Sequence, residues 1–101
     1  MPCQIIFSTR AAKDLKESFE WYENLEPGLG VRFIDFVDSV LGIIELYPES
    51  FPRKKGEFRE ASIRKFPYLI IYEYSPGDHT ILVLYIFHSH KRPKRKYSRK
   101  R

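Results

Sequence analysis

Residues 68–87, YLIIYEYSPGDHTILVLYIF, contain two nearly continuous runs of apolar and aromatic side chains. The runs, 68–74 and 80–87, are separated by the sequence PGD at 76–78. Such runs are typical of strands buried within a sheet, and proline, glycine and aspartate together are typical of a turn. The stretch therefore predicts an antiparallel hairpin whose two strands lie at the centre of a sheet.

Two further segments have strand character. Residues 58–66 alternate between apolar positions such as Ile63 and polar positions such as Arg64, which predicts a strand with one buried face. The sequence CQIIF at 3–7 predicts a short first strand. Residues 48–56, PESFPRKKG, contain two prolines and a glycine, and this composition predicts a loop.

The segment between these strands predicts two helices. Ser8 or Thr9 is a suitable N-cap, and apolar side chains recur every three or four residues over 11–25 and again over 33–47. The first stripe comprises Ala11, Leu15, Ser18 or Phe19, Tyr22 and Leu25, and the polar face comprises Asp14, Glu17 and Glu20. The sequence PGLG at 27–30 separates the helices. The predicted fold is α+β in the order β-α-α-β-β-β, with a two-helix hairpin packed on a small antiparallel sheet.

Length and composition exclude several classes of protein. With 101 residues, 43% of them hydrophobic, the chain is expected to form one folded domain. Cys3 is its single cysteine, and three separated histidines make no metal site, so we expect no disulfide, metal or cofactor. The apolar run 81–87 is too short to cross a membrane and no signal peptide is visible. We expect a cytoplasmic protein without a membrane partner.

The charges are strongly segregated along the chain. Net charge is +5, yet residues 90–101 hold eight Lys and Arg side chains and no acid, so we divide the chain into a domain at 1–89 and a basic C-terminal tail at 90–101. Residues 14–49 are mainly acidic, whereas 53–65 are mainly basic. This segregation favours an anionic partner on one surface. The predicted binding residues are Arg53, Lys54, Lys55, Arg59, Lys65, Lys91, Lys94, Arg95 and Lys96.

A series of short motifs carries a resemblance to a known family. They are Trp21-Tyr22-Glu23, Gly28-Leu29-Gly30 followed by Arg32-Phe33, Pro48 with Phe51-Pro52, Arg64 with Phe66-Pro67-Tyr68 and Tyr72, and Ile86-Phe87-His88 with Pro93. In this order and spacing, which spans nearly the whole domain, the chain resembles toxins of the RelE/ParE superfamily, the toxic partners in bacterial type II toxin–antitoxin modules. The family fold, a helical hairpin on a small antiparallel sheet, agrees with the element order predicted above.

The resemblance implies a growth-inhibiting toxin held in check by a cognate acidic antitoxin. Its target would be DNA gyrase, as for ParE-like toxins, or mRNA on the ribosome, as for RelE-like endonucleases, which use no metal. For a nuclease the resemblance implies Arg64, His88, Arg92 and Tyr97 as catalytic residues, with Lys91 as an alternative to Arg92. Two departures from the nuclease pattern favour the ParE-like function: Lys91 stands at the arginine of a His-x-x-Arg-x-Pro pattern, and Tyr97 lies one residue beyond the usual aromatic.

A different class of function is a non-toxic nucleic-acid-binding module, for which the basic tail alone would suffice.

Several of these residues also have a purely structural interpretation. His88 is predicted to share a strand face with Leu82, Leu84 and Ile86, as a hydrogen-bonded structural histidine would. Arg64 has the alternative of an ion pair across the sheet with Glu60 or Glu73. Side chains expected in the core are Trp21, Tyr22 and Cys3, and His79 is expected to be exposed.

Overall fold

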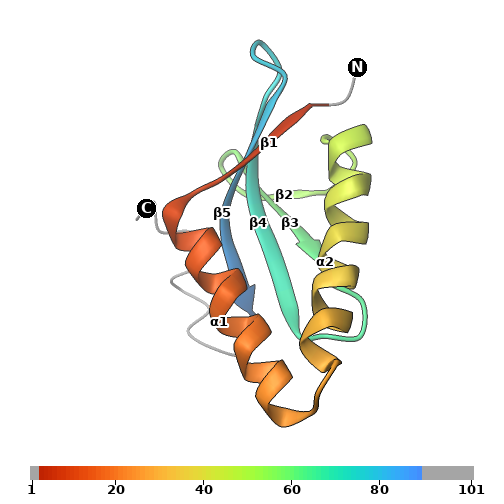
Figure 1. Ribbon diagram of the computed structural model, residues 1–101. Helices are drawn as coiled ribbons and strands as arrows, with labels where there is room; N and C mark the ends of the chain where they lie inside the picture. The colour runs from red at the N-terminus through yellow and green to blue at the C-terminus, as the bar shows by residue number, and fades with distance from the viewer. Residues whose placement is uncertain (1–2, 90–101) are drawn as a thin grey trace.

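The computed structural model describes residues 3–89, which form two helices and one five-stranded sheet (Figure 1). In chain order the elements are β1 (Gln4–Phe7), α1 (Thr9–Leu25), α2 (Leu29–Leu46), β2 (Arg53–Lys55), β3 (Phe58–Ser62), β4 (Tyr68–Ser75) and β5 (Thr80–His88). Both helices cover one face of the sheet, as predicted, and the α+β fold class is confirmed.

The sheet has the strand order β1-β5-β4-β3-β2. The β4–β5 hairpin lies at its centre, as the apolar runs predict, and β3 pairs antiparallel with β4. Strand β1 pairs parallel with β5, so the sheet is mixed rather than wholly antiparallel. The two paired strands are the first and the last of the described strands. Both helices and strands β2 to β4 lie between them in the sequence, and β5 then runs alongside β1 in the same direction.

Strand β2 lies in the segment that we predicted as a loop. Its three residues are all exposed at the sheet edge, so the alternation that identifies a half-buried strand is absent. Gly56, with φ of +56°, lies in the turn that joins β2 to β3. The guanidinium of Arg59 on β3 donates to the carbonyl oxygens of Phe51 at 2.7 Å and Glu49 at 3.4 Å. These contacts fix the segment preceding β2 against the sheet.

The helical hairpin is held by one carboxylate. Glu23 near the end of α1 accepts hydrogen bonds from the backbone N–H groups of Gly28 at 2.8 Å and Gly30 at 2.9 Å. It thereby satisfies two donors at the start of α2. A Cβ atom at Gly30 would lie 2.6 Å from the carbonyl oxygen of Phe19, so the two helices meet where only glycine fits. Gly28 has φ of +91°, which also favours glycine.

The main core lies between the helices and the sheet. An aromatic cluster at one end joins α1, α2 and the sheet through Tyr22, Phe33, Phe66 and Tyr68, with ring centroids 4.9 to 6.1 Å apart. Tyr22 is thus a packing residue, as predicted, and Cys3 is buried as expected.

A β-bulge in β5 changes which side chains face the helices. Tyr85 pairs with Ile71 and Val83 pairs with Tyr72, which leaves Leu84 as the extra residue. Val83 and Ile86 join the core under the helices, whereas Leu84 and Tyr85 join a second cluster with Phe58 and Ile71. The prediction that His88 shares a face with Leu82 and Leu84 is therefore wrong, because simple alternation does not continue through a bulge.

The described part of the chain, residues 3–89, contains no helix of the length and apolar character needed to cross a membrane.

The Gly30 contact generates a stability prediction. Gly30→Ala should lower the free energy of unfolding by about 1 to 3 kcal/mol, because the opposing atom at 2.6 Å is backbone and cannot move aside cheaply. Gly42→Ala is the matched control in the same helix, since nothing lies within 4 Å of its Cβ position, and it should raise stability by about 0.5 to 1 kcal/mol. Urea unfolding measures both; a Gly30→Ala variant as stable as Gly42→Ala would contradict the close helix contact.

The buried hydroxyl of Tyr72 generates a second stability prediction. Its hydroxyl donates to the carbonyl oxygen of Pro48 at 2.8 Å, and burial raises the pKa of Tyr72 to about 12 from an ordinary value of 10.0. The folded state therefore holds this proton more tightly, and its contribution to stability is lost as the pH rises from about 10 to about 12. Tyr72→Phe should lose about 1 kcal/mol at neutral pH and show a shallower alkaline decline.

The exposed Tyr47 provides the matched control, because Tyr47→Phe removes a hydroxyl from the surface and should leave the neutral stability unchanged. Thermal unfolding between pH 7 and pH 11.5 measures the two variants against the unsubstituted chain. An alkaline decline that is the same with and without the Tyr72 hydroxyl would disprove its role.

Candidate functional site

A groove of about 800 Å³ lies between α1 and the last residues of β5. Helix α1 lines it with Arg10, Asp14, Glu17, Ser18, Trp21 and Tyr22. The sheet lines it with Tyr68, Ile86, Phe87 and His88. Its size is within the range of ligand and peptide sites, and aromatic and ionisable side chains share its walls.

The groove exists because β1 is shorter than β5. Strand β1 ends at Phe7, opposite Val83, while β5 continues to His88. Beyond that point α1 takes the place of a neighbouring strand. Ser8 donates its N–H to the carbonyl oxygen of Val83 at 2.9 Å, and its hydroxyl donates to that of Leu84 at 2.9 Å.

Asp14 continues this contact one turn along α1. Its carboxylate accepts the N–H of Ile86 at 3.2 Å and the Nε–H of Arg10 at 2.9 Å. Burial raises the pKa of the Asp14 carboxyl above its ordinary value, while both hydrogen bonds act in the opposite direction. We predicted Asp14 on the polar face of the helix, and this is wrong: it faces β5 and satisfies a backbone donor there.

Aromatic side chains form the other end of the groove. His88 packs against Tyr68 with ring centroids 5.1 Å apart, and Tyr22 lies 6.1 Å from Tyr68. Trp21, predicted in the core, is 62% exposed, and Leu25 is 61% exposed. Ser18 and Tyr22 belong to the inward-facing stripe of α1, and Trp21 lies at the edge of that stripe. Its side chain therefore extends past the core into solvent.

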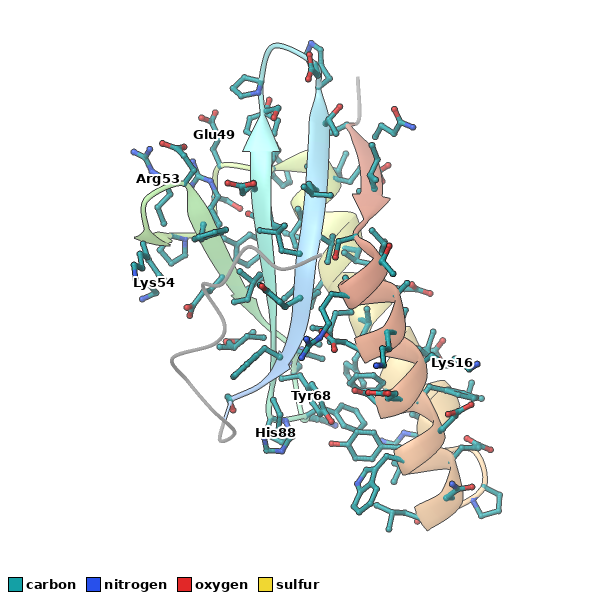
Figure 2. The ribbon with its side chains drawn as sticks, turned by 90° about the vertical axis from the view of Figure 1, so that its left-hand side faces the viewer. Lys16, Glu49, Arg53, Lys54, Tyr68 and His88 are labelled. Atoms are coloured by element: carbon teal, nitrogen blue, oxygen red, sulfur yellow. The ribbon has the colours of Figure 1, made fainter. Side chains whose placement is uncertain are left out.

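The predicted cations of β2 lie elsewhere. Arg53, Lys54 and Lys55 are exposed along the sheet edge, and Figure 2 shows Arg53 and Lys54 well apart from Tyr68 and His88. Arg53 pairs with Glu57 at 3.4 Å, an exposed contact that contributes little to stability. Cations on an edge strand also discourage pairing with another sheet.

Arg64 and Lys65 occupy the turn between β3 and β4. Strand β3 ends at Ser62, so Arg64 is not on a strand as predicted, and it does not line the groove. Within residues 3–89 it forms no ion pair with Glu60 or Glu73. The ammonium of Lys65 lies 5.9 Å from the centre of the Phe36 ring, in a cation–π contact.

The structure describes two of the four predicted catalytic residues. His88 lines the groove and Arg64 lies in a turn outside it, while Arg92 and Tyr97 fall outside the described residues. The predicted tail contacts also fall outside them: Lys91, Lys94, Arg95 and Lys96.

Sequence reasoning missed the role of α1, where Arg10, Asp14 and Glu17 line the groove. The available signal was Asp14 itself, which precedes Ser18 by four residues and Tyr22 by eight and so belongs to the stripe that faces inward.

A metal site requires several ligating side chains close together. Over residues 3–89, no three His, Cys, Asp or Glu side chains come together as a potential metal site. His79 is exposed, as predicted, in the turn between β4 and β5.

Comparison with solved structures shows the fold in two toxin–antitoxin systems. A chain from the chromosomal ParDE system of P. aeruginosa is similar with a TM-score of 0.73 and 14% identity, over 85% of this chain and 95% of that one. A chain of the RelBE2 toxin–antitoxin complex of Mycobacterium tuberculosis is similar with a TM-score of 0.58 and 21% identity, over 87% of this chain and 99% of that one.

Comparison with curated proteins finds no match. The model of one protein family, described as the ParE toxin of the type II toxin–antitoxin system parDE, matches residues 5–93. The match covers both helices and all the strands described above except the first residue of β1, and the fold agrees with it independently. The chain therefore belongs to the ParE toxin family of type II toxin–antitoxin systems.

Proposed function

We propose that this protein is a growth-inhibiting toxin that acts on DNA gyrase and is neutralised by a cognate antitoxin. Family membership supports the toxin function. The observation that favours gyrase over mRNA is the charge that the described residues, 3–89, give to the groove that His88 lines. There α1 supplies the carboxylates of Asp14 and Glu17, and the guanidinium of Arg10 is already bonded to Asp14.

Phosphodiester cleavage by a ribose hydroxyl requires cations that stabilise the charge developing on phosphorus. The carboxylates of Asp14 and Glu17, which line the same groove as His88, would instead repel a phosphate. Arg64, the cation implied for that role, does not line the groove. These features support a toxin that binds its target rather than cleaves RNA.

The RelE-like endonuclease is retained as the second candidate because of two observations. One is the fold similarity to a chain of a RelBE2 complex, and the other is the placement of His88 beside Tyr68.

For the antitoxin we propose a segment that docks along α1 and enters the groove. Trp21 and Leu25 lie one turn apart on α1 and are both more than half exposed. Exposed apolar side chains beside a groove are typical of a surface that a partner covers. The two solved structures described above come from toxin–antitoxin systems, which supports a partner of this kind.

The cations outside the groove are proposed as a second contact. Arg53, Lys54 and Lys55 form an exposed basic edge, and Arg59 and Lys65 lie on the elements that follow. An acidic stretch of the antitoxin is the partner that matches this charge. The protein is proposed to act in the cytoplasm, where gyrase and ribosomes are found.

The direct test is inhibition of gyrase by the purified chain. We expect the protein to block ATP-dependent supercoiling of relaxed plasmid in vitro, and to arrest cells with filamentation and DNA damage while bulk mRNA remains intact. Adding the co-expressed product of the adjacent reading frame should restore supercoiling. Ribosome-dependent mRNA cleavage with unaffected gyrase would establish the RelE-like function, and a harmless chain would favour a nucleic-acid-binding module.

Arg64→Ala separates the two mechanisms within cells. If the toxin acts on gyrase, the variant should arrest growth as the unsubstituted chain does, because Arg64 is an exposed turn residue outside the groove. For a nuclease, losing a transition-state cation would lower the cleavage rate on the order of 10²-fold or more and abolish toxicity. Growth after induction, with the expression level verified by immunoblot, distinguishes these outcomes.

A further inference from the structure

Glu17 and Trp21 form an exposed pair at the mouth of the groove. They are four residues apart on α1, so their side chains lie next to each other on one helix face. Both side chains line the groove, and Trp21 is 62% exposed. Within residues 3–89 the Glu17 carboxylate forms no ion pair.

Among residues 3–89, the charged side chains that line the groove are one arginine and two carboxylates, so their sum is negative. Its one arginine, Arg10, is bonded to Asp14 at 2.9 Å and lies 5.8 Å from the centre of the Tyr85 ring. Asp14 in turn is occupied by Arg10 and by the Ile86 N–H. Figure 2 shows Lys16 on the side of α1 turned away from the sheet, so it does not neutralise the groove. Over residues 3–89, Glu17 is the groove carboxylate that forms no ion pair.

The walls around this charge are aromatic. Trp21 and Tyr22 come from α1, and Tyr68 and His88 come from the sheet. A guanidinium group stacks on aromatic rings, is weakly hydrated, and binds a carboxylate through two parallel hydrogen bonds. A carboxylate one helical turn from an exposed indole provides both kinds of contact for the same group.

We infer that the groove binds an arginine side chain of the antitoxin, with its guanidinium over the Trp21 indole and paired with Glu17. The inference rests on the proposed function, because it specifies the chemistry of the segment that enters the groove. Arginine is preferred to lysine because its planar guanidinium can stack on the Trp21 indole and bind the Glu17 carboxylate through two hydrogen bonds at the same time. The residues flanking this arginine are apolar, since they meet the exposed Leu25 and the groove residues Ile86 and Phe87.

Trp21 is the only tryptophan of the chain, so its signals report on this site alone. The probes are the peptide acetyl-Ala-Leu-Arg-Leu-Ala-amide and the same peptide with citrulline, which keeps the shape of arginine without its charge. Each is titrated into the ¹⁵N-labelled full chain while the Trp21 indole N–H resonance is followed. The arginine peptide should shift this resonance saturably, and the citrulline peptide should bind at least about tenfold more weakly.

Substitution in the protein completes the test. Glu17→Gln should weaken binding of the arginine peptide about fivefold and remove most of its advantage over citrulline. Glu20→Gln is the matched control, because Glu20 is exposed on the same helix and does not line the groove, and it should leave the affinity unchanged.

Equal affinity for the two peptides, no saturable shift with either, or equal effects of the two substitutions would overturn the inference. Such a result, if the unsubstituted chain still inhibits gyrase, would disprove the arginine site and leave the proposed function standing. If the unsubstituted chain fails to inhibit gyrase, the proposed function is wrong, whatever affinities the peptides show.

Discussion

The buried hydroxyl of Ser8 is the contact from which the arrangement of this protein follows. It accepts the N–H of Ala11 at 2.9 Å, which caps α1, and donates to the Leu84 carbonyl oxygen at 2.9 Å, which fixes the start of that helix to β5. Asp14 repeats the attachment at Ile86. Because these two side chains replace a strand beside β5, the helix and the strand border an open groove rather than a closed sheet.

Most of the fold could be predicted from local patterns. The apolar runs that became β4 and β5, the helical stripes of α1 and α2, and the PGLG break all act through neighbouring residues. Strand β2 and the parallel pairing of β1 were missed because both depend on which strand lies alongside, and a three-residue exposed edge strand has no periodicity of its own. The bulge at Leu84 was missed for the same reason, and it changes the face of every residue that follows.

The candidate site was less predictable than the fold. His88 was identified, but its neighbours come from α1, whose approach is set by Ser8 and Asp14 and not by the residues around His88. The density of positive charge in the sequence indicated the cations of β2 instead. These cations lie at the sheet edge formed by β2, away from His88. A carboxylate such as Asp14 within an inward-facing stripe is the kind of signal that identifies such a groove in advance, because a buried charge requires a partner.

Over residues 3–89, two surfaces of opposite character therefore lie on one small domain: an aromatic groove lined by the carboxylates of Asp14 and Glu17, and a basic sheet edge. The most direct measurement of their roles is hydrogen–deuterium exchange of the chain alone and in complex with the product of the adjacent reading frame. If the groove holds the partner, amides of residues 14–25 and 84–89 should become protected in the complex. Protection confined to residues 53–59, with the α1 segment and the end of β5 unchanged, would contradict this account.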